Sequence, residues 1–137
     1  MVLPFRTGFG FDVHRLVEGR DLWIGGVKIE HSLGLLGHSD ADVAIHALCD
    51  AMLGAAALRD IGFHFPDSDP PTNGIEASKK HASDAWPTLL SGKKAETNPL
   101  ENADITICAE APKMNPTSPP CRRLWLNALA AIQMTSR

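Results

Sequence analysis

Residues 34–62 read GLLGHSDADVAIHALCDAMLGAAALRDIG and carry the strongest local structural pattern of the chain. Ser39, followed three residues later by Asp42, is similar to a capping box, and acidic side chains suit the positive end of a helix. Alanines and larger apolar residues then recur at helical spacing from Val43 to Ala56. The stretch predicts a helix that begins near Ser39 and whose small residues pack closely against a sheet.

Shorter patterns on both sides of this helix predict strands and therefore an α/β fold. Residues 3–12 are apolar at intervals, and Gly8 and Gly10 would let their backbone approach a neighbour closely. Asp21–Ile29 predicts a hairpin or a bent strand that turns at Gly25 and Gly26. Other segments predict a strand at 104–109, helices at 76–86 and 122–134, and a proline-containing loop at 59–74.

Composition limits the classes of function. The 137 residues are 44% hydrophobic and 21% charged, which suits one domain with a real core. The net charge of −3 and the scattered basic residues exclude a basic nucleic-acid-binding surface. No apolar run approaches the roughly 20 residues of a membrane span, and we expect no signal or transit peptide at the start. The three cysteines lack a CxxC spacing and are expected to be small buried thiols in a reduced compartment, at positions 49, 108 and 121.

Three residues suggest a metal site. Asp12 and His14 are two positions apart, so in an extended chain both side chains point to one face. His46 lies one helical turn after Asp42 in the predicted helix. A carboxylate and two imidazoles are the mixed oxygen and nitrogen ligands of a catalytic zinc site, which keeps its fourth position open. The alternatives are a solvated strand end for Asp12 and His14 and a hydrogen-bonded core histidine for His46.

Six motifs occur in a fixed order along the chain. They are G-x-G-x-D-x-H at 8–14, I-G-G-V at 24–27, G-H-S-D-x-D-V-x-x-H-A-x-x-D-A at 37–51, G-A-A-x-L-x-D-I-G at 54–62, F-P-D-S-D at 65–69 and A-P-K-M at 111–114. Together they resemble the 2-C-methyl-D-erythritol 2,4-cyclodiphosphate synthase family of the non-mevalonate isoprenoid pathway. The resemblance is dense from about residue 5 to 70, weak through 71–102, and returns at 103–114.

The resemblance implies a lyase that breaks a phosphorus–oxygen bond. Members of the family act on a methylerythritol 2-phosphate that carries a CDP group. The 2-phosphate oxygen attacks the β-phosphorus, CMP leaves, and a cyclic diphosphate forms. By resemblance, Asp12, His14 and His46 bind zinc, and His38 and Ser39 contact the substrate phosphates, with His38 stabilising the transition state. The alternative for His38 is a loop histidine that caps a helix.

The resemblance also implies the remaining substrate contacts. One group holds the ribose and the methylerythritol portion, although FPDSDP by itself is also typical of a plain turn. A second group cradles cytosine through backbone groups and Lys113. The first group is Asp60, Ile61, Gly62, Phe65, Pro66, Asp67, Ser68 and Asp69, and the second is Ala109, Glu110, Ala111, Pro112, Lys113, Met114 and Asn115. Asp12, Val13 and His14 are expected to contact the substrate as well.

At the level of the whole molecule, the resemblance implies a homotrimer with active sites between neighbouring subunits. It implies an α/β domain over residues 1–137 with a mixed sheet and helices packed on one face. The expected partners are a diphosphocytidyl substrate and other copies of the chain, with no nucleic acid or membrane. The expected location is the bacterial cytoplasm, or the plastid stroma in a plastid-bearing eukaryote.

The end of the chain departs from the family pattern. Family members continue into a strand with a Thr-Thr-x-Glu-like element, whose threonines bind the diphosphate and whose glutamate binds a second metal, Mg²⁺ or Mn²⁺. Here the sequence ends in QMTSR at Arg137, and we find no such glutamate, so we expect the C-terminal strands to be missing. The alternative functions are therefore a non-catalytic remnant that binds zinc and a cytidine nucleotide, or an unrelated small zinc hydrolase.

Overall fold

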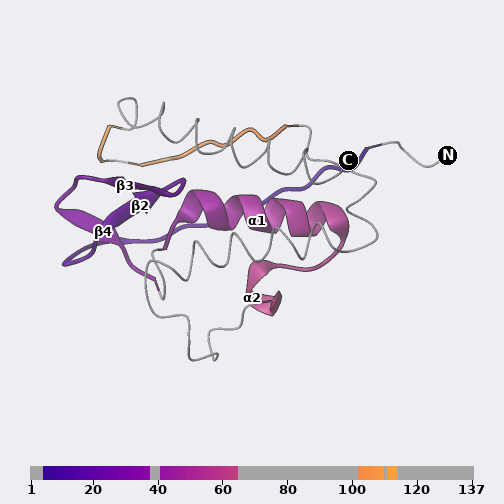
Figure 1. Cartoon of the computed structure of the whole chain (residues 1–137), viewed down its shortest axis with the longest axis horizontal. Coiled ribbons are helices and arrows are strands. Elements are labelled where there is room, and N and C mark those ends of the chain that lie inside the picture. Colours follow the sequence, from indigo (N-terminus) through magenta and orange to yellow (C-terminus); the bar gives the residue numbers. More distant parts are fainter. Residues whose placement is uncertain (1–4, 38–40, 65–101, 110, 114–137) are drawn as a thin grey trace.

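The structure, a computed structural model, describes residues 5–37, 41–64, 102–109 and 111–113 (Figure 1). In Figure 1 the strands gather at one end of the longer helix, and the short helix lies beside it. Among the described residues, none of the helices has the length and apolar character needed to cross a bilayer. The elements are β1 (Leu16–Glu18), β2 (Leu22–Ile24), β3 (Val27–Ile29), β4 (Leu33–Leu35), α1 (Val43–Ala56) and α2 (Ile61–His64).

The described strands pair in two antiparallel sheets of two strands each. β1 pairs with β4, and β2 pairs with β3 in the hairpin that the sequence predicts, with Leu22 opposite Ile29. Gly25 and Gly26 form the turn with φ values of 63° and 76°, a conformation that glycine adopts at low cost. β1 and β4 were not predicted, and the mixed sheet that we expected is not seen among the described strands.

The described core lies between the hairpin, β4 and the start of α1. Its buried members on the strands are Leu22, Ile24, Ile29 and Leu35, and α1 contributes Ala44. Burial of these side chains is the main favourable contribution to folding at this end of the molecule. The core therefore attaches the first turn of α1 to the sheets.

Two of the cysteines fall within the described residues, and they differ. Cys49 on α1 is a buried free thiol, and burial, reinforced by the charges of Asp50 and Asp42, raises its pKa to about 12. Such a thiol is inert at neutral pH. Cys108 is free and exposed, so the prediction of a buried thiol was wrong there. Cys121 lies outside the described residues.

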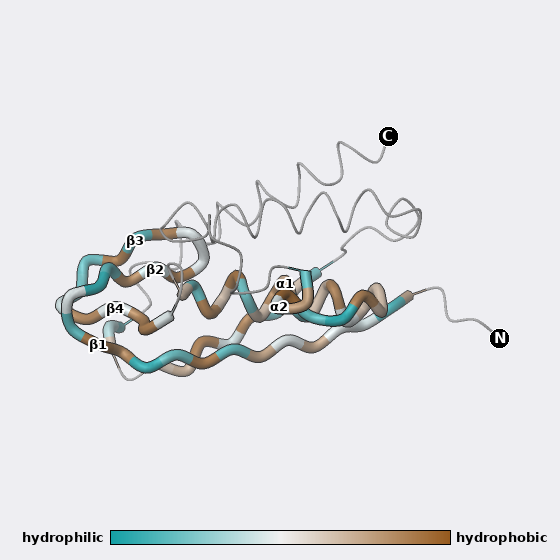
Figure 2. Tube along the Cα trace, turned by 90° about the horizontal axis from the view of Figure 1, so that it is seen from below, coloured by the Kyte–Doolittle hydropathy of each residue, from teal (hydrophilic) through white to brown (hydrophobic). Residues whose placement is uncertain are grey.

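Residues 5–15 run extended along α1 but do not form the strand that we predicted over 3–12, as Figures 1 and 2 both show. A Cβ atom at Gly8 would overlap the carbonyl oxygen of Ala51, and one at Gly10 would overlap that of Ala47. The prediction of close backbone approach was therefore correct. The strand prediction is not met among the described residues, because no described strand pairs with this segment.

Two further boundaries differ from the predictions. The N-cap of α1 is Asp42, three residues after the predicted start, and its carboxylate accepts hydrogen bonds from the Ala44 and Ile45 amides. Residues 104–109 form no strand, because alternation predicts an extended chain but does not supply a paired neighbour. α2 lies inside the predicted loop 59–74. The predicted helices at 76–86 and 122–134 lie outside the described residues.

The contact between residues 5–15 and α1 can be tested with a matched pair of glycines. Gly10→Ala forces a methyl group into the Ala47 carbonyl, whereas a Cβ at Gly54 on α1 would meet nothing within 4 Å. We expect Gly10→Ala to lower the free energy of unfolding by about 1–3 kcal/mol, and Gly54→Ala to raise it by about 0.5–1 kcal/mol. Urea unfolding measures both changes. Equal stability of the Gly10→Ala variant and the unmodified chain would contradict the close approach.

Candidate metal centre

Asp12, His14 and His46 converge in the structure from two different elements. Asp12 and His14 lie on the extended segment, on the same side as Gly8 and Gly10, and therefore face α1. His46 lies in the first turn of α1, where its amide donates a 3.0 Å hydrogen bond to the Asp42 carbonyl. Each of the three residues offers one ligand atom, and these atoms all lie within 4.8 Å of one another.

The distances within the cluster suit a tetrahedral metal ion. Asp12 Oδ2 lies 3.4 Å from His14 Nε2 and 3.2 Å from His46 Nδ1. Ligands that surround zinc tetrahedrally at about 2.0–2.1 Å are separated from one another by about 3.3–3.4 Å. Two of the three distances between the ligand atoms are already close to that value, so the side chains fit a small divalent cation.

The surroundings of the cluster hold two of the side chains in place and leave part of each exposed. Asp12 Oδ1 accepts a 2.8 Å hydrogen bond from the Val13 amide, which leaves Oδ2 for the two imidazoles. A Cβ atom at Gly37 would lie 3.3 Å from His14 Cε1, so this glycine makes room for the imidazole. The side chains of Asp12, His14 and His46 are 21%, 27% and 18% exposed, so the cluster lies near the surface although Asp12 Oδ2 itself is buried.

The electrostatics of the cluster favour the ionised carboxylate. Partial burial raises the pKa of Asp12, but the contact with His46, the positive charges that His14 and His46 can carry and the Val13 amide together outweigh it. The pKa of Asp12 is consequently lower than its ordinary value. An ionised carboxylate is the form that binds a cation.

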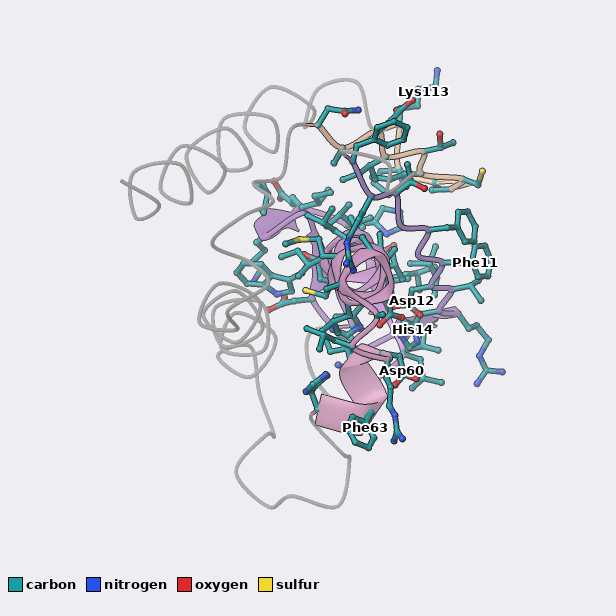
Figure 3. The ribbon with its side chains drawn as sticks, turned by 90° about the vertical axis from the view of Figure 1, so that its right-hand side faces the viewer. Phe11, Asp12, His14, Asp60, Phe63 and Lys113 are labelled. Atoms are coloured by element: carbon teal, nitrogen blue, oxygen red, sulfur yellow. The ribbon has the colours of Figure 1, made fainter. Side chains whose placement is uncertain are left out.

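A second region on the same side of α1 is built around α2. The Ile61 amide donates a 2.8 Å hydrogen bond to Asp50 Oδ1, so a carboxylate on α1 holds the start of α2. Asp60 Oδ1 accepts a 2.9 Å hydrogen bond from the Phe63 amide and thereby caps this short helix. Figure 3 shows Asp12, His14 and Asp60 on one side of α1. Asp50 is hydrogen-bonded to Ile61 and is not one of the three residues of the metal cluster.

The other predicted site residues are only partly described. Val13, Ala109 and Lys113 are exposed, as is Ala111, and Pro112 is half-buried. Lys113 lies at the far edge of the molecule from Asp12 and His14 in Figure 3 and points away from them. One chain therefore does not bring Lys113 to its own cluster of Asp12, His14 and His46. His38, Ser39, Phe65, Pro66, Asp67, Ser68, Asp69, Glu110, Met114 and Asn115 lie outside the described residues.

One feature beside Asp60 has no signal in the sequence. Arg59 has a left-handed backbone with φ of 72°, and its guanidinium carbon lies 4.1 Å from the centre of the Phe63 ring. The ring of Phe63 in turn meets His64 edge-on. A cation over an aromatic face is worth about 0.5–1 kcal/mol at an exposed site. The pair lies beside Asp60 at the start of α2.

Comparison with known proteins identifies the family. The model of the YgbB family matches residues 5–135, which is nearly the whole chain. The chain belongs to the YgbB family. A relative in that family, the 2-C-methyl-D-erythritol 2,4-cyclodiphosphate synthase of Porphyromonas gingivalis, is 56% identical over 124 residues, covering 90% of this chain and 74% of the relative.

Solved structures of similar proteins agree with the fold. One, a 2C-methyl-D-erythritol-2,4-cyclodiphosphate synthase in its CDP-bound form, has a TM-score of 0.70 at 36% identity, covering 90% of this chain and 79% of that one. The CDP complex of IspF from Plasmodium falciparum has a TM-score of 0.70 at 29% identity, covering 91% and 73%. The YgbB-family chain thus shares the α/β fold of these enzymes, as the sequence predicted.

The lowered pKa of Asp12 leads to a test in the metal-free chain. Because the pKa is lower in the folded state, ionisation of Asp12 stabilises the fold above the unfolded-state pKa of about 4. That contribution is lost as the pH falls through the folded-state pKa. Between about pH 5 and pH 3, the unmodified chain should therefore lose more stability than Asp12→Asn. Urea unfolding with a chelator present measures this, and parallel pH profiles would contradict it.

Proposed function

We propose that this chain is a 2-C-methyl-D-erythritol 2,4-cyclodiphosphate synthase, a phosphorus–oxygen lyase of isoprenoid biosynthesis. The observation that carries the proposal is the 56% identity to a synthase over 90% of this chain. The cluster of Asp12, His14 and His46 supports it independently, because its geometry suits a divalent cation. The alternatives of a non-catalytic remnant and of an unrelated hydrolase have no comparable support.

The proposed metal is zinc, held by Asp12, His14 and His46. Two nitrogens and one oxygen at tetrahedral spacing suit this ion, and three protein ligands leave one position for the substrate. When bound, the ion would withdraw charge from phosphate oxygens as a Lewis acid. The protein's own contribution is to orient the two phosphates, since phosphoryl transfer depends on positioning and on charge neutralisation.

The proposed reaction is an intramolecular displacement at phosphorus. An oxygen of the 2-phosphate forms a bond to the β-phosphorus of the diphosphate, and the bond from that phosphorus to the oxygen of CMP breaks. CMP leaves with the electron pair, and the cyclic diphosphate remains. We assign His38 and Ser39 to the phosphates, which suits their place in the chain between Gly37 beside His14 and the buried Ala41.

The nucleotide is assigned to two segments. Asp60–Gly62 and Phe65–Asp69 would hold the ribose and the methylerythritol portion, and the hydrogen bond from Ile61 to Asp50 supports a fixed position for the first. Ala109–Asn115 would hold cytosine. Because Lys113 points away from the metal ligands of its own chain, a neighbouring subunit would have to supply the cytosine half of each site. The family resemblance also implies a second metal, Mg²⁺ or Mn²⁺, but we assign no residue of this chain to it.

Activity and metal content together test the proposal. We expect about one zinc ion per chain and release of CMP from the diphosphocytidyl 2-phosphate substrate, with the cyclic product followed by phosphorus NMR. His46→Ala should lose most of the zinc and slow CMP release by at least about 10²-fold, the size of effect of one preorganised group. Asp21→Asn, a change at an exposed ion pair with Lys28, should alter neither. A folded, zinc-containing chain that releases no CMP would contradict the proposal.

We also propose the homotrimer, because one side of residues 5–15 is apolar and exposed. Even-numbered residues of this segment face α1, so the odd-numbered ones face outward, and Figure 3 shows Phe11 pointing away from the helix. Phe9 is 85% exposed and Phe11 and Val13 are each 71% exposed. Figure 2 shows apolar residues recurring along this segment. Large adjacent apolar side chains on a surface are typical of an interface.

A negative charge placed among the exposed side chains of Phe9, Phe11 and Val13 tests the assembly. Phe9→Asp should convert the trimer into monomers in light scattering, because burial of an unpaired carboxylate at an interface is unfavourable. Phe63→Asp is the matched control, since Phe63 on α2 is also exposed but packs under Arg59, away from residues 5–15. A trimer that persists in Phe9→Asp, or a stable monomer in the unmodified chain, would contradict this interface.

A further inference from the structure

Asp42 is the only buried charged side chain in the described part of the chain, with 0% exposure. Its carboxylate accepts hydrogen bonds from four backbone amides of the described residues. Two come from the first turn of α1, the amides of Ala44 and Ile45 at 3.2 Å each. Two come from the turn of the β2–β3 hairpin, the amides of Gly25 at 2.9 Å and Gly26 at 2.6 Å.

These bonds exceed what a helix cap requires. An N-cap side chain accepts one or two hydrogen bonds from the first turn, and serine or asparagine performs this task as well as aspartate. The two shorter bonds of Asp42 go instead to a turn 16 and 17 residues away in the sequence. A carboxylate is needed here because only it has two oxygens that both accept.

The second function of Asp42 concerns the metal ligands. His46 follows Asp42 by one turn, and its amide is bonded to the Asp42 carbonyl. The two other ligands, Asp12 and His14, come just before β1 in the chain. The Arg15 carbonyl, next to His14, accepts a hydrogen bond from the Leu36 amide after β4, which ties this segment to β4. β4 contacts β2 of the hairpin. The hairpin to which Asp42 is hydrogen-bonded is thus connected, through β4, to the segment that carries Asp12 and His14.

We propose that Asp42 is a positioning residue of the metal centre. By tying the start of α1 to the hairpin, its carboxylate sets the rotation and the height of the first helical turn, and so holds His46 against Asp12. Neighbouring geometry supports this role: Ala41 is buried with a left-handed φ of 54°, a conformation that the bonds of the next residue help to hold. The inference rests on the metal centre of the proposed function.

Three variants separate the two tasks of Asp42. Asp42→Ser can still cap α1 through its hydroxyl, but it is too short to reach the hairpin. Asp42→Asn keeps the shape and one acceptor oxygen, while its NH₂ group replaces the second and faces an N–H. Asp21→Asn is the matched control, because it removes one negative charge from the same hairpin and only an exposed ion pair to Lys28.

The experiment measures the affinity of each full chain for Zn²⁺ by competition with a chromophoric chelator. Circular dichroism confirms folding, and salt near 0.15 M screens distant surface charges. We expect Asp42→Ser and Asp42→Asn to bind Zn²⁺ about 10- to 100-fold more weakly, as for loss of a group that orients a ligand, and Asp21→Asn to bind normally. A merely structural role would lower the melting temperature but leave the affinity of the folded chain unchanged.

The possible outcomes distinguish this inference from the proposed function. Normal Zn²⁺ affinity in the Asp42 variants would overturn the positioning role and leave the metal centre intact, whereas absence of Zn²⁺ binding by the unmodified chain would overturn both. If the Asp42 variants do not fold, hydrogen exchange of the unmodified chain decides. Coupling between sites is reciprocal, so Zn²⁺ should slow exchange of the Gly25 and Gly26 amides. Unchanged exchange at both glycines would overturn the inference.

Discussion

The carboxylate of Asp42 joins the start of the helix α1 to the turn of the β2–β3 hairpin. A buried charge is costly unless hydrogen bonds replace its lost water, and four backbone amides do so here. Those amides belong to the turn of the β2–β3 hairpin and to the first turn of α1. The apolar core that packs around this point closes the same junction. Asp42 and the surrounding core therefore both fix the start of α1 against the β2–β3 hairpin.

One face of α1 carries three polar residues at intervals of four: Asp42, His46 and Asp50. On an isolated helix such a row would face water. Here Asp42 is hydrogen-bonded to the hairpin turn, and His46 Nδ1 lies 3.2 Å from Asp12 Oδ2. Asp50 accepts a 2.8 Å hydrogen bond from the Ile61 amide. The helix therefore sets the distance between the cluster at His46 and α2. Gly8 and Gly10 complete the arrangement, because only glycine lets the extended segment lie so close to the helix backbone.

Local patterns predicted elements well where the structure is determined by residues close in sequence. The hairpin at Gly25 and Gly26 and the helix through His46 were predicted, because turn conformation and helical periodicity depend on neighbours within a few residues. The segment 3–12 was predicted as a strand, and its described part proved extended but unpaired. Alternation specifies an extended backbone, but a strand requires a partner with free N–H and C=O groups. The short strands β1 and β4 were missed because three residues give no usable period.

The sequence by itself indicated the family and the three candidate metal ligands, since Asp12, His14 and His46 lie in ordered motifs whose residue types already suit a cation. Only the tertiary structure decided what the neighbouring carboxylates do. Asp42 was predicted to lie in the helix start, yet two of its four hydrogen bonds go to Gly25 and Gly26. Asp50 lies one turn after His46 in the sequence, and the structure shows it accepting a hydrogen bond from the Ile61 amide. The physical reason is that a carboxylate accepts from any amide that folding brings within about 3 Å. Which amides those are depends on packing between segments far apart in the sequence.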